Sequence, residues 1–312
     1  MPRKLLIDTD PGVDDALALF LALGSPEAEV VGITTTFGNI ETGAATLNAL
    51  YLLEFSGHPE IPVARGARTP VNGACRTPAT HVHGENGLGN VLIPAPLTAP
   101  LRASAPEFIA RTVMDSPGEI TLVTLGPLTN LALALELEPR LSTAVAQVVV
   151  MGGAFRVQGN ISGTAEANIF NDPVAASRVL SQDWPLTLVG LDVTTRVVLT
   201  PDHLQRLRQP PHRLGEFIWR ITRVYEDFHL RRYGLVGLYA HDPTAIVCVL
   251  DPTLFQYEEA LVAVTLEGRE AGRTVMKPLP PESLRVARHV PKICTDVNAG
   301  QVIDFIQRRL AR

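Results

Sequence analysis

The feature that most constrains the fold is a regular alternation of short apolar segments with longer segments of helical periodicity. Residues 4–8 and 30–37 predict buried strands, and residues 13–23 and 41–55, which follow them, predict helices. Further strands are predicted at residues 120–125, 145–151 and 186–191, and further helices from residue 128 and at 201–209, 214–233, 242–250 and 296–310. Such alternation is typical of a parallel sheet covered by helices on its faces. The sequence therefore predicts an α/β fold with an open, mostly parallel (mixed) sheet flanked by helices.

Chain length leaves the number of domains open, because 312 residues at about 150 per domain allow two. However, no Ser/Gly linker, charge run or internal repeat divides the chain, so we expect residues 1–312 to form a single domain. The one long irregular stretch, residues 65–101, is rich in Pro, Gly, Asn and His. A loop of that length is usually functional or mobile, and closure over a ligand is one role for it.

Charge and cysteine content exclude several classes of function. The chain has 27 Lys and Arg against 32 Asp and Glu, a net charge of −5, so it has no basic excess for nucleic acid or an anionic membrane. We also expect no membrane span, since no apolar run approaches 20 residues, and no secretion signal. The three cysteines, Cys75, Cys248 and Cys294, are too few for a disulfide framework. These features predict a cytoplasmic protein.

Four carboxylates follow the first predicted strand within eight residues: Asp8, Asp10, Asp14 and Asp15. The carboxyl ends of strands are where open α/β sheets bind their ligands. Four carboxylates in one turn repel each other, and a hard divalent cation would offset that repulsion. The alternative for Asp14 and Asp15 is that they only cap the following helix. The cluster as a whole predicts a metal or catalytic site.

The residue types favour calcium as the metal. Calcium takes six to eight oxygen ligands, so Asp10 and Asp15 need partners from elsewhere in the chain. Asp242, at a second strand-to-helix junction, and the main-chain carbonyl of Leu125 are the candidates. Magnesium is the near alternative. Zinc is a further one, because the His-Val-His sequence at residues 81–83 would place two imidazoles on one side of an extended chain.

A second polar group lies in the Gly-rich segment at residues 152–172, after a very apolar predicted strand. Asn160, Glu166 and Asn168 are suited to form bidentate hydrogen bonds with vicinal hydroxyl groups, as a sugar presents them. The alternative is that Asn and Gly simply favour turns here. The combination with an acidic metal-like site favours a sugar ligand.

Six motifs, in order along nearly the whole chain, resemble those of the inosine-uridine preferring nucleoside hydrolase family. They are Asp-Thr-Asp-Pro-Gly-Val-Asp-Asp at 8–15, Thr-Thr-Thr-Phe-Gly-Asn at 34–39, His-Gly-Glu-Asn-Gly-Leu at 83–88, Met-Gly-Gly at 151–153, Glu-Ala-Asn at 166–168 and His-Asp-Pro at 241–243. The first is highly specific. The resemblance implies calcium-dependent hydrolysis of the N-glycosidic bond of ribonucleosides, a role in nucleoside salvage, and assembly as a homodimer or homotetramer.

The resemblance also implies roles for the matching residues. It makes Asp10, Asp15, Asp242 and the main-chain oxygen of Leu125 the calcium ligands, and Asp10 also the base that faces the attacking water. The family pattern has Thr where this chain has Leu125, but only the carbonyl oxygen is used. On the ribose it places Asp14, Asn39, Met151, Asn160, Glu166, Asn168 and Asp242.

The leaving nucleobase needs a proton donor opposite the carboxylates, because the transition state resembles an oxocarbenium ion. The resemblance places His241 there, and an ordinary histidine pKa of about 6.5 suits this role. The alternative is that His241 orients Asp242 by a hydrogen bond. His83 is a second candidate for contacting the base. Aromatic or histidine side chains that could stack on a purine or a pyrimidine are Tyr225, His229, Tyr233 and Tyr239.

Two other functions compete with the hydrolase. A nucleoside or sugar sensor would keep the pocket without turnover, and calcium-dependent release of ribose distinguishes the two. A phosphotransferase of the haloacid dehalogenase type also has the Asp8-x-Asp10 pattern after its first strand. That class needs a downstream Lys and a Gly-Asp acidic motif, neither of which is evident here.

Overall fold

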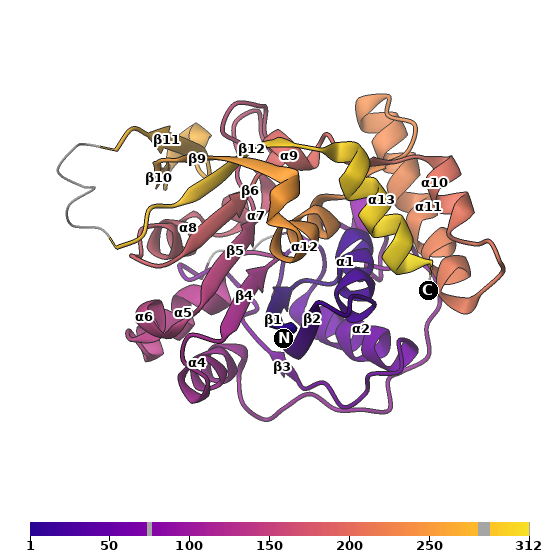
Figure 1. Ribbon diagram of the computed structural model, residues 1–312, viewed down its shortest axis with the longest axis horizontal. Helices are drawn as coiled ribbons and strands as arrows, with labels where there is room; N and C mark the ends of the chain where they lie inside the picture. Colours follow the sequence, from indigo (N-terminus) through magenta and orange to yellow (C-terminus); the bar gives the residue numbers. More distant parts are fainter. Residues whose placement is uncertain (74–76, 280–287, 312) are drawn as a thin grey trace.

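An eight-stranded sheet forms the centre of the computed structural model, which describes residues 1–73, 77–279 and 288–311 (Figure 1). Its strand order is β3-β2-β1-β4-β5-β6-β12-β9, and only the β12–β9 pair is antiparallel. The prediction of an open, mostly parallel sheet is confirmed. The strands are β1 (Arg3–Thr9), β2 (Ala28–Thr35), β3 (Val63–Arg65), β4 (Ile120–Thr124), β5 (Gln147–Met151), β6 (Leu186–Val189), β9 (Phe255–Glu259) and β12 (Lys292–Val297).

Helices cover both faces of the sheet because its central strands are apolar on both sides. In β1, the buried Leu5 and Ile7 join one core cluster, and Leu6 joins the other. The first cluster lies under α1 (Val13–Leu23), α2 (Thr42–Phe55), α12 (His241–Leu250) and α13 (Ala299–Leu310). The second lies under α4 (Ala105–Asp115), α5 (Thr129–Leu137) and α8 (Pro173–Leu180). Figure 1 shows the two groups on opposite sides of the sheet.

The strand order reverses at β1, and this reversal positions the site. From β1 the chain adds β2 and β3 on one side and then returns to place β4 on the other side of β1. The turns that follow β1 and β4 therefore lie next to each other at the carboxyl edge. The Leu125 amide donates a hydrogen bond to the Asp8 carbonyl at 2.7 Å, which joins the two turns. Such a switch point is where open α/β sheets bind ligands.

The C-terminal part of the fold differs from the prediction. The last helix begins at Ala299 rather than at residue 296, since residues 296 and 297 complete β12 and the Asn298 side chain caps the helix by accepting from the Gln301 amide. The strands β12 and β9 were not predicted, because both mix charged and apolar residues. The other helices are α3 (Thr80–His83), α6 (Leu141–Ala144), α7 (Ala167–Asn171), α9 (Leu191–Thr194), α10 (Pro201–Arg206) and α11 (Arg213–Tyr233).

In the long stretch at residues 65–101, the described residues after Arg65, the last residue of β3, are irregular apart from α3. Cys75 lies outside the described residues. Its described parts are attached to the body of the protein at several points. The Val71 amide donates to Asp172, and the Thr98 amide donates to Glu54. Leu88 is fully buried. This stretch therefore forms part of the packed structure around the site.

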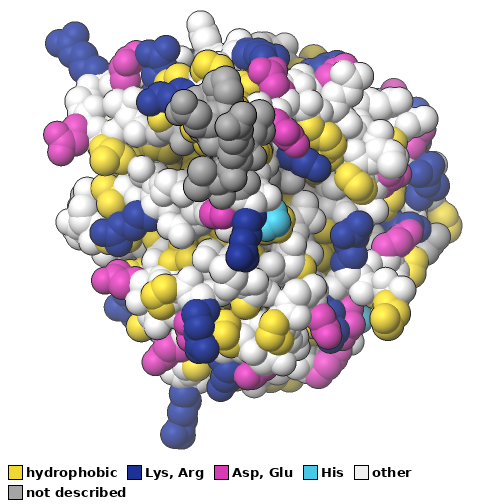
Figure 2. All heavy atoms as spheres, turned by 60° about the vertical axis from the view of Figure 1, so that its left-hand side comes forward, with side chains coloured by type: hydrophobic (Ala, Val, Ile, Leu, Met, Phe, Trp, Pro, Cys, Tyr) yellow, Lys and Arg dark blue, Asp and Glu magenta, His cyan; other side chains and the backbone are white. Residues whose placement is uncertain are grey.

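On the face drawn in Figure 2, acidic and basic side chains are interspersed, and neither sign forms a continuous patch. Over the described residues, no helix combines the length and the apolar character that crossing a bilayer requires.

Candidate active site

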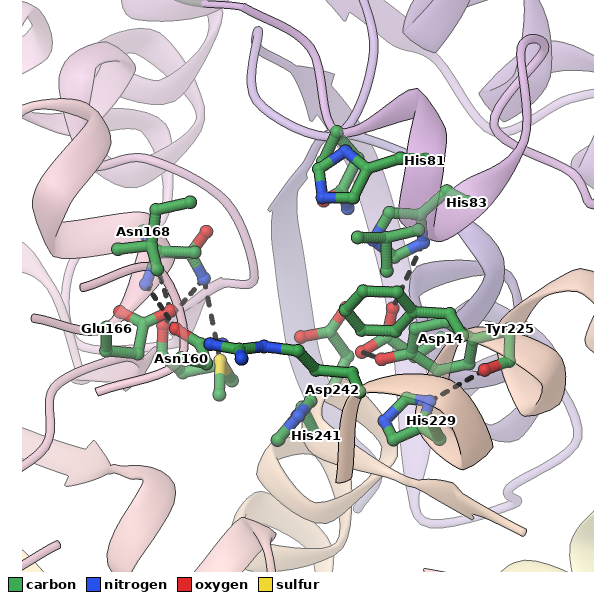
Figure 3. Close-up of a pocket in the computed structure, with 18 of the residues that line it drawn as sticks. Asp14, His81, His83, Asn160, Glu166, Asn168, Tyr225, His229, His241 and Asp242 are labelled. Carbon is green, nitrogen blue, oxygen red and sulfur yellow. Dashed lines mark hydrogen bonds and ion pairs between the residues drawn. The ribbon is translucent and has the colours of Figure 1, made fainter. Parts of the chain in front are cut away.

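A cavity of about 320 Å³ opens at the carboxyl edge of the sheet, where the turns after β1 and β4 meet (Figure 3). Its walls also include the loop after β5, α3, the C-terminal half of α11 and the start of α12. The structure thus brings together residues predicted from motifs far apart in the sequence. The predicted residues that line it are Asp14, Asn39, His83, Leu125, Met151, Asn160, Glu166, Asn168, His241 and Asp242.

Buried carboxylates make one end of the cavity strongly acidic. Oxygens of Asp14, Asp15 and Asp242 all lie within 4.8 Å of one another, and each side chain is buried. Burial raises the pKa of Asp242 well above its ordinary value, and the charges of Asp14 and Asp15 raise it further. Burial and the charge of Asp15 likewise raise the pKa of Asp10 and Asp14. This end of the cavity therefore needs either protons or a cation.

The acidic turn is held by hydrogen bonds to Asp15 and Asp10. Asp15 accepts from the Gly12 amide at 2.9 Å, from the Asn39 side chain at 2.8 Å, and from Thr9. One oxygen of Asp10, Oδ2, accepts from the Asn39 amide at 2.6 Å. Its other oxygen, Oδ1, is buried and has no hydrogen-bond partner among the described residues. An unpartnered buried carboxylate oxygen is costly and points to a missing ligand or proton.

Two glycines make room for Asp10. A Cβ atom at Gly38 would lie 2.0 Å from Oδ2 of Asp10, and one at Gly126 would lie 2.7 Å from Oδ1. Gly38 also has a φ of +149°, which other residues rarely adopt. Both positions therefore require glycine.

The donor set fits a hard cation. The available ligands are carboxylate oxygens and the Leu125 carbonyl, and oxygen ligands are what calcium and magnesium prefer. That carbonyl already accepts a hydrogen bond from the Asn168 side chain at 2.7 Å. The compact acidic triad contains Asp14, which the family resemblance places on the ribose. It does not contain Asp10, which the resemblance makes a calcium ligand.

The histidines at residues 81–83 do not have the geometry of the predicted zinc alternative. They lie in the short helix α3 and not on an extended chain. Nδ1 of His83 accepts a hydrogen bond from the Val13 amide at 3.1 Å, at the start of α1. Among the described residues, the cluster with metal-binding geometry is the aspartate triad.

The loop after β5 has both a structural and a cavity-lining role. Glu166 caps α7 by accepting from the amides of Asn168 and Ile169 at 2.8 and 3.1 Å. Asn160 accepts from the Ala167 amide at 2.9 Å. Glu166 and Asn160 therefore hold the local backbone, and the same side chains line the cavity (Figure 3).

Main-chain partners fix the protonation of two histidines on the cavity wall. Because the Val13 amide can only donate, Nδ1 of His83 is bare and Nε2 carries the proton. Nδ1 of His229 lies 2.7 Å from the Tyr225 carbonyl, which can only accept, so Nδ1 carries the proton there and Nε2 is bare. Burial lowers the pKa of His83 to about 3 and that of His229 to about 4, so both rings are neutral.

The environment of His241 bears on both the predicted role as proton donor and the alternative of orienting Asp242. Its hydrogen-bond partner among the described residues is Thr194, at 2.7 Å, and not Asp242, so His241 does not orient Asp242 by the hydrogen bond considered above. The pKa of His241 is lowered to about 3, mainly by burial and to a lesser extent by the neighbouring His229 and His83. The expected pKa near 6.5 is therefore wrong, because this ring is removed from water.

Two cavity residues on α11, Phe228 and Arg232, were not predicted. They share a helix face with three predicted residues, at the spacing i, i+3, i+4, i+7 and i+8 from Tyr225. That spacing is visible in the sequence, but it is also the pattern of an ordinary packed helix. Of the predicted aromatic residues, Tyr225, His229 and Tyr233 line the cavity. Tyr239 packs behind them, with its ring centre 5.1 Å from that of His229.

Comparisons with known proteins point to one family. A family model described as inosine-uridine preferring nucleoside hydrolase matches residues 5–304. The probable uridine nucleosidase 2 of Arabidopsis thaliana is 43% identical, covering 99% of this chain and 97% of the relative. A solved plant nucleoside hydrolase superposes with a TM-score of 0.95 at 37% identity, covering 100% and 99% of the two chains. A purine-preferring ribonucleoside hydrolase from Gardnerella vaginalis gives a TM-score of 0.93 at 33% identity, covering 99% and 98%.

The buried carboxylates predict that the metal-free protein loses stability as the pH rises. In the unfolded chain these carboxyl groups release their protons near pH 4. In the folded protein their pKa values are raised, that of Asp14 to about 8, so the protons are retained to higher pH. The folded state then binds more protons than the unfolded state, so the free energy of unfolding falls between pH 4 and 8, by about 1.4 kcal/mol per pH unit for each such group. Urea unfolding with a chelator at pH 5, 6, 7 and 8 measures this slope.

Excess calcium should reduce the slope, because a bound cation replaces the protons. Asp14→Asn should also flatten the slope in the chelated protein, whereas Asp304→Asn, on the exposed face of α13, should leave it unchanged. A slope that is the same in wild type and Asp14→Asn would show that Asp14 does not retain its proton in the folded state.

Proposed function

The chain belongs to the inosine-uridine preferring nucleoside hydrolase family, and from this premise we propose that it uses calcium and the acidic end of the cavity to hydrolyse ribonucleosides. It is an enzyme that hydrolyses the N-glycosidic bond of nucleosides. Family membership therefore decides against the sensor and the phosphotransferase considered from the sequence. One observation carries the proposal for the site. Buried carboxylates at the switch point lie at a cavity that is also lined by amide, histidine and aromatic side chains.

Asp10, Asp15, Asp242 and the Leu125 carbonyl are proposed to hold the calcium ion. When bound, the ion offsets the repulsion among the carboxylates and lowers the pKa of a water molecule. Asp10 then accepts the proton of the attacking water. Its Oδ1 atom supports this role, because that oxygen has no hydrogen-bond partner among the described residues while the Asn39 amide fixes Oδ2. Calcium acidifies water far less than zinc does, so an adjacent base is needed.

Polar side chains around the acidic end are proposed to bind the ribose hydroxyl groups. Carboxylates accept hydrogen bonds from hydroxyls, and side-chain amides can both donate and accept. Burial makes each such bond selective, because a lost partner leaves a buried polar atom unpaired. The residues concerned are Asp14, Asn39, Asn160, Glu166, Asn168 and Asp242, with Met151 packing beside them.

His241 is proposed to assist the departure of the nucleobase from the other side of the ribose. A neutral imidazole performs this role by donating a hydrogen bond from its ring N–H to the leaving base. His83 supplies a second ring N–H at the cavity wall. On α11, Tyr225, Phe228, His229, Arg232 and Tyr233 provide the surface against which the base would lie.

Three further parts of the proposal concern the whole chain. The participation of β1 and β12 in one sheet supports a single domain over residues 1–312. An assembly of two or four copies follows from the family resemblance alone. A cytoplasmic location is supported by the two described cysteines, Cys248 and Cys294, which are free thiols.

The first test is ribose release from inosine, uridine, adenosine and cytidine by purified protein. Ribose should be released from at least one of them, release should stop after chelation, and calcium should restore it. Magnesium added in place of calcium is the control for the identity of the ion. Full activity after complete removal of metal would refute the calcium-dependent mechanism.

Asp10→Asn should lower kcat by about 10³-fold or more, because the amide cannot accept the proton of the attacking water. The asparagine side chain is nearly the same size, so the fold should be retained, as judged by circular dichroism. Asp202→Asn, on the exposed side of α10, serves as the control. Turnover like that of wild type would remove Asp10 from the mechanism.

His241→Ala should lower kcat for inosine and uridine by about 10²-fold or more, in the range expected for the loss of a positioned proton donor. The kcat for nitrophenyl riboside should fall much less, because its leaving group departs without a proton donor. Parallel kinetics on the three substrates measure the difference. Equal losses on all three would mean that His241 does not act on the leaving group.

A further inference from the structure

The first residue of α12 and the last residue of α9 meet behind the cavity. Nδ1 of His241 lies 2.7 Å from the hydroxyl oxygen Oγ1 of Thr194. Thr194 is fully buried and is absent from the cavity wall, whereas His241 forms part of that wall. A short antiparallel pairing joins the segment after Thr194 to the segment before His241, with Val198 opposite Tyr239. The contact is therefore built into the backbone, although 47 positions separate the two residues.

We propose that Thr194 is a positioning residue which holds the His241 ring with its Nε2–H directed to the leaving nucleobase. This inference rests on the proposed role of His241 at the leaving group. Nothing in the motifs pointed to Thr194, because it lies between two of them.

The direction of the hydrogen bond follows from the number of partners. A threonine hydroxyl has one proton to donate, and the only partner of the Thr194 hydroxyl within the described part of the chain is His241. The site is closed to water, since Thr194 is fully buried. A buried hydroxyl that kept its proton unpaired would lose about 1–3 kcal/mol. The hydroxyl therefore donates to Nδ1.

This direction determines the tautomer of His241. A neutral imidazole carries one ring proton, so a bare Nδ1 leaves the proton on Nε2. Nε2 is the ring nitrogen that remains for the cavity. His229 on the same wall has the opposite arrangement, because its Nδ1 donates to the Tyr225 carbonyl. Without Thr194, His241 would be free to adopt that tautomer and would then present a bare nitrogen to the base.

Three variants test the proposal. Thr194→Val has the same shape but lacks the hydroxyl, and Thr194→Ser restores the hydroxyl. Thr195→Val is the matched control, because the neighbouring Thr195 hydroxyl donates to the Leu191 carbonyl and not to His241. Each variant is assayed for kcat and KM on inosine, uridine and nitrophenyl riboside. Circular dichroism and melting temperature establish that each is folded.

We expect Thr194→Val to lower kcat on inosine and uridine by about 10-fold or more, a part of the contribution of a positioned donor. Its KM and its activity on nitrophenyl riboside should change less than about 2-fold, since neither depends on the donor. Thr194→Ser should recover most of the loss. Equal losses on all three substrates in a folded Thr194→Val protein, or kinetics like those of Thr195→Val, would overturn the inference.

Nitrogen-15 spectra of histidine-labelled wild-type protein provide a measurement that does not depend on any variant of Thr194. The His241 signals, identified by their loss in His241→Gln, should show an unprotonated Nδ1 and a protonated Nε2. A protonated Nδ1 would overturn the inference. If His241→Ala lowers kcat equally on all three substrates, the proposed function of His241 is refuted. If His241→Ala lowers kcat on inosine and uridine but not on nitrophenyl riboside, while Thr194→Val leaves kcat unchanged, only the inference about Thr194 is refuted.

Discussion

Repulsion among buried carboxylates is the constraint on which the site depends. Asp10, Asp14, Asp15 and Asp242 are each at most 5% exposed, and neighbouring carboxylates add to the effect of burial in raising the pKa of Asp10, Asp14 and Asp242. Hydrophobic burial elsewhere must hold them together, because the carboxylates alone would separate. The sheet provides this support: β1 lies between β2 and β4 with an apolar cluster on each face, so the turn after it cannot relax outward.

The surrounding polar groups divide the carboxylates into two kinds. Asp15 is held by hydrogen bonds on both of its oxygens, including one from the Gly12 amide and one from the Asn39 side chain. Such donors favour the ionised form and fix its position. Among the described residues, Asp10 keeps one oxygen without a hydrogen-bond partner, and the side chain that donates to Asp14 is Tyr225, at 3.2 Å. The fully bonded Asp15 is suited to hold a cation in a fixed position. Asp10 keeps an oxygen that can accept a proton in addition to binding the cation, and Asp14 is suited to bind hydroxyls.

Much of this arrangement could be predicted from the sequence, because local rules and the chain order agree for the first strand and helix. The predicted boundaries of α1 match the structure at both ends, since Gly12 and Gly24 flank an uninterrupted apolar periodicity. The edge strand β9 and its neighbour β12 could not be predicted, because pairing rather than apolar pattern defines them. Thr194, Phe228 and Arg232 were missed for a related reason: only tertiary structure distinguishes them from ordinary helical residues.

The carboxylates and the histidines of the cavity carry out opposite electrostatic tasks, and each task depends on a different physical means. In the reaction of this family, positive charge develops on the ribose, and the acidic end stabilises it. The histidines must avoid adding positive charge, and burial achieves this by keeping His83, His229 and His241 neutral. A neutral ring still has one nitrogen that donates and one that accepts a hydrogen bond, and the partner of Nδ1 determines which is which. The Val13 amide and the Tyr225 carbonyl each permit one tautomer only, so the fold sets whether these rings donate or accept.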